Sequence, residues 1–126
     1  MNDSSLKLLN NIAQIIFDKK GFNIIALDSC GTSSITDFVI IAEGSVERHV
    51  SSISEAIQDE LKKKGKKPFH LEGQLSGDWI ALDYSEVIIH LLIPSLREKY
   101  QLENLWKDYE IIDLDIDISN SQYMSN

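Results

Sequence analysis

Two kinds of apolar spacing alternate along this chain of 126 residues and restrict it to a fold that mixes helices with strands. Between residues 6 and 17, apolar side chains recur every three or four positions, which is typical of an amphipathic helix with one buried face. Short β-branched runs at 24–27 and 37–42 lie on either side of a Cys-Gly-Thr-Ser-Ser cluster, which indicates two buried strands joined by a turn.

Residues that can begin or end helices lie at the expected places. Asp3 or Ser4 can cap the first helix, which we expect to end near Gly21. Ser45 can cap a second helix that should stop at Gly65. The apolar face of this second helix consists of Val46, Val50, Ile53, Ala56, Ile57 and Leu61.

Three more strands and a short helix are expected in the rest of the domain. The strands cover 69–72, 79–83 and 87–93, the last two joined by a tight turn at 84–85, and the helix covers 94–106. The sequence therefore predicts a single α/β domain with a mixed sheet of about five strands and flanking helices.

Residues 108–126 differ in composition from the predicted domain at 1–107. They hold five acidic residues, no Lys or Arg, and a polar ending rich in Ser and Asn. We interpret them as an acidic, flexible C-terminal tail. The alternating acids at 113–117 leave an edge strand as the alternative.

The charge of the chain argues against a general nucleic-acid binder. Twelve Lys and Arg stand against twenty Asp and Glu, for a net charge of −8, whereas phosphate contacts need clustered cations. The one basic run, five lysines within 62–67, could make a minor RNA contact. It is also placed to stabilise the negative end of a helix dipole. A basic partner suits the acidic balance better.

A single cysteine and a polar N-terminus point to a reducing compartment. Cys30 cannot form an internal disulfide, and without a Cys-His signature it is a turn residue rather than a nucleophile. The first five residues lack the cations of a signal peptide, and no apolar run reaches the about 20 residues that span a bilayer. We expect a cytoplasmic protein without membrane association.

The expected strand-to-helix junction at Gly44 and Ser45 could hold a phosphate on backbone N–H groups, and it looks like the Gly-Ser opening of nucleotidyltransferases. That chemistry needs paired carboxylates for metal ions, but only Glu47 and Glu55 follow on this helix. The only Asp-x-Asp pattern lies at 113–117, outside the predicted core. A nucleotide-binding enzyme is therefore a minor alternative, and no catalytic residue is predicted.

The three histidines, His49, His70 and His90, have no metal-ligand spacing, so neither a metal site nor a cofactor is predicted. His90 lies in the apolar run 87–93, where a hydrogen-bonded structural role and a surface-facing role are both open.

An acidic and aromatic stretch is the best candidate for a binding surface. Residues 68–96 contain no Lys or Arg but four acids, and Trp79 and Tyr84 lie among them. Aromatic anchors with complementary charge are typical of a surface that docks a basic protein. Trp79 could equally be a core residue.

Separated motifs in this chain resemble those of the Iojap-like ribosomal silencing factors. In order, and spanning about residues 5–107, the motifs lie at 37–45, 48–57, 72–73, 77–84, 87–90 and 97–106. The resemblance implies a nucleotidyltransferase-like α/β fold that lacks the transferase residues, in agreement with the missing carboxylates.

The resemblance also implies a non-enzymatic role on the ribosome. Members of the family bind the large ribosomal subunit at its intersubunit face, through the basic fourteenth large-subunit protein, and sterically prevent the small subunit from joining. They thereby repress translation, and they are commonly homodimers when free. A large-subunit assembly factor that uses the same surface is the alternative.

The family motifs suggest which residues bind the partner. The docking role falls on Trp79, Leu82, Asp83 and Tyr84, with Glu86 and His90 as neighbours, and the last motif adds Arg97, Tyr100, Glu103 and Trp106. For the last motif, a structural clasp of the final helix onto the sheet is the alternative.

Overall fold

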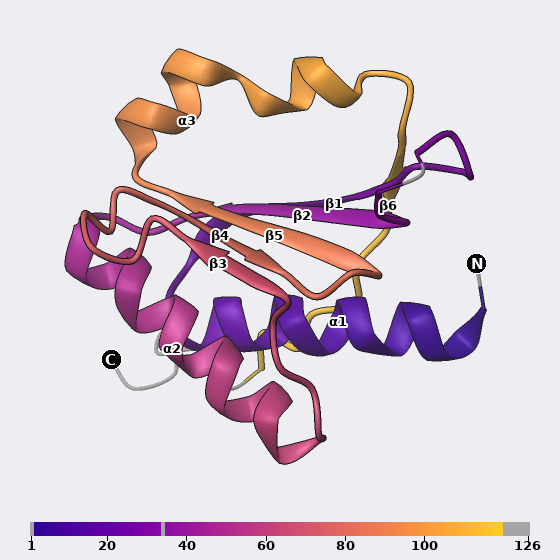
Figure 1. Cartoon of the computed structure of the whole chain (residues 1–126), viewed down its shortest axis with the longest axis horizontal. Coiled ribbons are helices and arrows are strands. Elements are labelled where there is room, and N and C mark those ends of the chain that lie inside the picture. Colours follow the sequence, from indigo (N-terminus) through magenta and orange to yellow (C-terminus); the bar gives the residue numbers. More distant parts are fainter. Residues whose placement is uncertain (1, 34, 120–126) are drawn as a thin grey trace.

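The computed structural model describes residues 2–33 and 35–119, and it has a six-stranded mixed sheet at its centre (Figure 1). The elements in chain order are α1 (Asp3–Asp18), β1 (Phe22–Asp28), β2 (Phe38–Glu43), α2 (Glu47–Lys63), β3 (His70–Glu72), β4 (Trp79–Asp83), β5 (Val87–Leu92), α3 (Pro94–Tyr100), the 3₁₀ helix η1 (Leu102–Trp106) and β6 (Glu110–Ile112). The strand order is β3-β4-β5-β2-β1-β6, with β2 parallel to β5 and the other neighbours antiparallel. The predicted α/β class and mixed sheet are confirmed.

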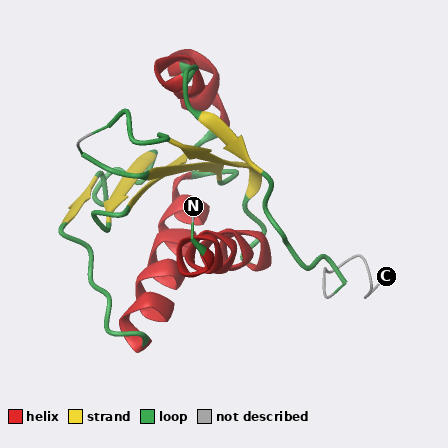
Figure 2. Ribbon diagram, turned by 90° about the vertical axis from the view of Figure 1, so that its right-hand side faces the viewer, coloured by secondary structure: helices red, strands yellow, loops and turns green. Residues whose placement is uncertain are grey.

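Helices cover the two faces of the sheet unequally. The long helices α1 and α2 lie against one face, and the short α3–η1 segment lies over the other (Figures 1 and 2). The main core forms between the sheet and the long helices, from residues such as Leu9, Ile53, Ile80 and Ile89. A smaller core under α3–η1 holds Leu27, Val39, Ile41, Leu92 and Leu102.

The central position of β2 explains its continuous apolar run. Every residue of this strand is buried, because one face packs on the long helices and the other on α3–η1. The last of them is Glu43, a buried carboxylate that needs a partner.

The helix starts differ from the predicted caps. Asn2, rather than Asp3 or Ser4, caps α1, and its side chain accepts a hydrogen bond from the Ser5 N–H. The N-cap of α2 is Val46, which has no side-chain acceptor, and Ser45 lies one residue earlier. The ring of His49 in the first turn of α2 holds the residue before this N-cap, because its Nδ1 accepts the Ser45 N–H at 2.8 Å.

The predicted final helix at 94–106 is broken at Gln101. This residue has a left-handed backbone, with φ of 45°, so the chain ends α3 and restarts as η1. The break turns η1 back across the sheet, where Leu102 is buried.

The first part of the C-terminal segment lies against the domain. Residues 110–112 form β6 on the free edge of β1, where Ala26 pairs with Ile112. The next residues run along α1, where Asn10 and Gln14 accept the backbone N–H groups of Asp115 and Asp117. The edge strand thus forms at 110–112 rather than at 113–117, and the flexibility of the tail stays a prediction. Residues 120–126 lie outside the described part.

Candidate docking surface

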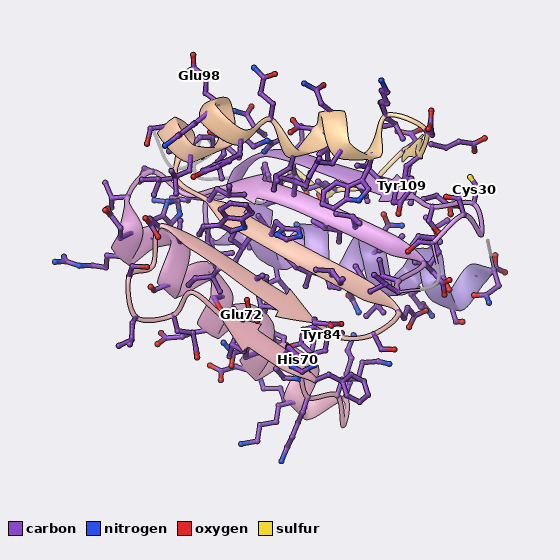
Figure 3. The ribbon with its side chains drawn as sticks, turned by 45° about the horizontal axis from the view of Figure 1, so that its top comes forward. Cys30, His70, Glu72, Tyr84, Glu98 and Tyr109 are labelled. Atoms are coloured by element: carbon purple, nitrogen blue, oxygen red, sulfur yellow. The ribbon has the colours of Figure 1, made fainter. Side chains whose placement is uncertain are left out.

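The α3–η1 layer covers β1, β2 and the end of β5 but leaves part of the sheet open. The side chains of β3 and β4 that share this face are partly or fully exposed. Figure 3 looks toward this side, with His70 and Glu72 on the outer strand β3. The edge of the sheet beyond α3–η1 is therefore the exposed part of this face.

Strand register defines which residues share the open part. His70 pairs with Asp83, Glu72 with Ala81, Ala81 with His90, Asp83 with Ile88, and Trp79 with Leu92. Because paired residues point to the same face of a sheet, these side chains form one surface. We call it the open sheet face, and it consists of His70, Glu72, Trp79, Ala81, Asp83, Ile88 and His90.

An aromatic row runs along the boundary between the open sheet face and α3–η1. It consists of Tyr100, Trp79, His90, Trp106 and Tyr109, with successive ring centroids 5.3, 5.9, 5.7 and 6.2 Å apart. Tyr100 at one end is 49% exposed. The row therefore joins rings of β4 and β5 to rings of α3, of η1 and of the residues just after η1.

Trp79 and His90 are joined by a hydrogen bond as well as by packing. The indole Nε1 of Trp79 donates to Nδ1 of His90 at 3.1 Å. Burial lowers the pKa of His90 to about 4, so the ring is neutral at pH 7. Both alternatives for His90 hold in part, because the ring is hydrogen-bonded and also belongs to the open face.

The open sheet face carries acidic groups but no Lys or Arg. Glu72 is exposed, and Asp83 is partly exposed with one oxygen accepting the Ser85 N–H at 2.8 Å. The residues of the open sheet face therefore supply two negative charges, from Glu72 and Asp83, next to a row of aromatic rings.

Arg97 fits the clasp alternative. Its guanidinium donates to Glu103 Oε2 at 2.9 and 3.1 Å, to the Asn23 carbonyl at 2.8 Å and to Glu43 Oε2 at 3.4 Å. Burial alone would raise the pKa of Glu103, but the hydrogen bonds from Arg97 outweigh this effect and lower it. Arg97 thus fixes α3–η1 to β1 and β2, and it lies away from the open sheet face.

Leu82, Tyr84 and Glu86 were also expected at the docking surface, but they do not lie on the open sheet face. Leu82 and Tyr84 are buried in the main core, on the side of the long helices. Glu86 lies in the β4–β5 turn and accepts a hydrogen bond from Ser5 on α1. Of the ten residues expected from the motifs, five thus lie on the open sheet face or in the aromatic row, namely Trp79, Asp83, His90, Tyr100 and Trp106. Glu103 belongs with Arg97 in the clasp.

Other members of the surface were not singled out from the sequence. Ala81 has no notable chemistry, but its place between Trp79 and Asp83 could have been derived from strand alternation. Tyr109 joins the aromatic row only because of the fold that follows η1, for which the sequence gives no signal.

The Gly44–Ser45 junction is already occupied by contacts within the chain. The Gly44 N–H donates to the Leu92 carbonyl, and the Ser45 N–H donates to His49. Neither backbone group is available for a phosphate. Across residues 2–33 and 35–119, no three His, Cys, Asp or Glu side chains are grouped as a metal site would require.

Cys30 lies in the β1–β2 loop, away from the open sheet face (Figure 3), and its φ of 55° fits the expected turn role. None of the helices within the described ranges has the length and apolar character needed to cross a bilayer.

The fold and the surface define an α/β domain with an acidic, aromatic open sheet face beside a clasped C-terminal segment. The family model described as "Ribosomal silencing factor during starvation" matches residues 2–125. The chain belongs to this family of ribosomal silencing factors, so the resemblance in its motifs is confirmed.

Individual relatives agree with this assignment. The chain is 38% identical over 101 residues to "Ribosomal silencing factor RsfS" of Haemophilus influenzae, covering 80% of this chain and 99% of the relative. A Mus musculus protein named "Mitochondrial assembly of ribosomal large subunit protein 1" is 32% identical over 74 residues, which are 56% of this chain and 32% of that protein. A crystal structure of a Chromobacterium violaceum protein superimposes with a TM-score of 0.78 at 27% identity, covering 95% of this chain and 98% of that one.

Proposed function

We propose that this protein binds the large ribosomal subunit through the open sheet face and the aromatic row, and keeps the small subunit from joining. The partner on the subunit is a basic protein of the intersubunit face, the fourteenth large-subunit protein. Binding represses translation in the cytoplasm without a chemical step. Membership of the silencing-factor family and the name of the Haemophilus relative support this role.

The observation that carries the proposal is the combination of rings and acids on one face. Trp79 and Tyr100 offer large, partly exposed rings, and Glu72 and Asp83 supply negative charge beside them. Such a surface gives affinity through the rings, and selectivity for a basic protein through the acids. Because one site on the large subunit cannot hold both partners, each binding event excludes the other.

A subunit-joining experiment tests the proposal. Excess protein should co-sediment with purified large subunits and lower the fraction of joined ribosomes on a sucrose gradient. Trp79→Ala should weaken this effect. Ile118→Ala is the matched control, because Ile118 is an exposed apolar residue on the segment that runs along α1. An unchanged joined fraction, without co-sedimentation of the wild-type protein, would refute the proposal.

An assembly role with the same surface is the second candidate, and the name of the mouse relative favours it. Depletion of the protein should then cause large-subunit precursors to accumulate, whereas pure silencing leaves the precursor level unchanged.

Two further proposals rest on the resemblance and on charge. The free protein is proposed as a homodimer, which sedimentation equilibrium can test. The lysines at 62–67 are proposed to make a minor RNA contact. Their place at the C-terminal end of α2 also fits the helix-dipole role.

A further inference from the structure

The centre of the open sheet face carries one hydrogen-bond donor whose direction is set by the chain itself. An indole N–H can only donate, so Nδ1 of His90 must accept the hydrogen bond from Trp79. The proton of the neutral ring therefore lies on Nε2. Trp79 thus fixes the tautomer of His90 before any partner arrives.

Nε2 of His90 is left without a protein partner. Within the described ranges no group bonds to it, although Nδ1 of the same ring is paired. The ring is partly buried between Trp79 and Trp106, so any partner that covers the aromatic row also covers this N–H. A donor that loses water without gaining an acceptor costs binding free energy, which makes this position selective.

We propose that His90 is a specificity-determining residue of the docking surface, where its Nε2–H donates to a backbone carbonyl oxygen of the basic protein partner. This inference rests on the proposed function, and it names the group on the partner that the same surface recognises. It adds one directional polar contact at the centre of the face, between the rings and the acids.

The charges around His90 decide which acceptor fits. Lys and Arg side chains have no acceptor atom, so the cations of a basic partner cannot pair with this N–H. A carboxylate would meet Glu72 and Asp83 on the same face, with Glu72 two strands from His90, about 10 Å away. An uncharged carbonyl meets neither objection, and a basic segment presents one at every residue. Its cationic side chains would then lie toward the two acids.

A double-mutant cycle separates direct contact from a role in holding Trp79. His90→Phe removes the donor but also leaves the Trp79 N–H without its acceptor. Trp79→Phe removes that N–H, so His90→Phe in the Trp79→Phe background tests the partner contact alone. Co-sedimentation with purified large ribosomal subunits measures the affinity of each variant. His90→Phe should weaken binding about tenfold in both backgrounds.

Two controls keep the test sharp. His90→Gln retains an acceptor for Trp79 and an amide donor, so it should recover part of the affinity. Melting curves must show that each variant is folded. If His90→Phe does not fold, ¹⁵N spectra of the wild-type imidazole still decide, because the inference requires the proton on Nε2 and a proton on Nδ1 overturns it.

The outcomes distinguish a failure of the proposed function from a failure of the proposed His90 contact. If the wild-type protein does not bind large subunits, the proposed function fails. If the wild-type protein binds but His90→Phe has no effect in the Trp79→Phe background, the docking proposal stands and the direct contact by His90 is refuted.

Discussion

Removal of Arg97 should destabilise the fold by about 3 kcal/mol, because its guanidinium joins distant parts of the chain. The Arg97 side chain is 11% exposed and that of Glu43 only 7%. Loss of one member of a buried ion pair typically costs about 3–5 kcal/mol, since the other charge remains buried. Glu43 keeps a 2.9 Å hydrogen bond from Asn23. The Glu103 side chain is 38% exposed, although its Oε1 atom is buried without a partner within the described ranges. The hydrogen bond that remains and the partial exposure place Arg97→Ala at the low end of this range.

Urea unfolding followed by tryptophan fluorescence measures this effect, because Trp79 and Trp106 both lie in the aromatic row. Arg48→Ala is the matched control, since Arg48 is exposed on α2 and makes no ion pair within the described ranges. It should change the free energy of unfolding by less than about 0.5 kcal/mol.

A second substitution tests the cause of the Arg97 effect. If the loss comes from the stranded Glu43 carboxylate, then Glu43→Gln should restore part of the stability of Arg97→Ala, because a neutral amide costs less to bury. If Arg97→Ala unfolds like Arg48→Ala, the clasp does not stabilise the fold. If the double variant is as unstable as the sum of the two single variants, the stranded Glu43 carboxylate is not the cause.

Three further predictions concern His90, Tyr84 and Gln14. The pKa of His90 lies at about 4 in the folded chain, below its ordinary 6.5, so stability that is present above pH 6.5 should be lost as the pH falls toward 4. As the pH falls, the wild-type protein should lose about 3 kcal/mol of unfolding free energy relative to His90→Phe, as measured by urea unfolding. If both proteins lose the same amount, the titration of His90 does not contribute to stability. Among the residues that the structure describes, Tyr84 Oη has no hydrogen-bond partner although it is buried. Tyr84→Phe should therefore leave the unfolding free energy unchanged or raise it by about 1 kcal/mol, whereas Tyr84→Ala should lower it by about 3 kcal/mol. A loss above 1 kcal/mol in Tyr84→Phe would show that the hydroxyl has a partner after all. Gln14→Ala removes two hydrogen bonds to Asp117 and should speed amide exchange across 113–119, as measured by mass spectrometry, while Gln58→Ala on α2 should not. Unchanged exchange in Gln14→Ala would mean that this segment is held by its apolar side chains alone.

The parts of the fold that follow from local periodicity could be predicted from the sequence. The helical spacing in α1 and α2 and the apolar runs of β2, β4 and β5 each indicate their element, because the core selects one face or both. For β4, alternation also predicts that Trp79 and Asp83 share a face and that Leu82 opposes them. The family motifs placed Leu82 at the docking surface, and the alternation shows why it is core.

The parts that depend on distant contacts could not be predicted. Gln101 breaks the last helix because its backbone is left-handed. This conformation is usually signalled in a sequence by Gly or Asn, and Gln is neither. The three residues of β6 become a strand only because β1 offers a free edge. Arg97 reaches Asn23, which is 74 positions away and has a positive φ beside an irregular pairing of β1 with β2. A motif can mark such a residue, but only the structure separates a clasp from a docking contact.

Photo-cross-linking from the open sheet face can show which ribosomal protein lies against it. A benzophenone side chain introduced at Glu72, which is exposed on β3, should cross-link to the fourteenth large-subunit protein when the variant is irradiated with purified large subunits. The same group at Ile118, on the segment along α1, should give no such product. Cross-links from position 118 but not from position 72 would contradict the account, because the large subunit would then contact a different side of the protein.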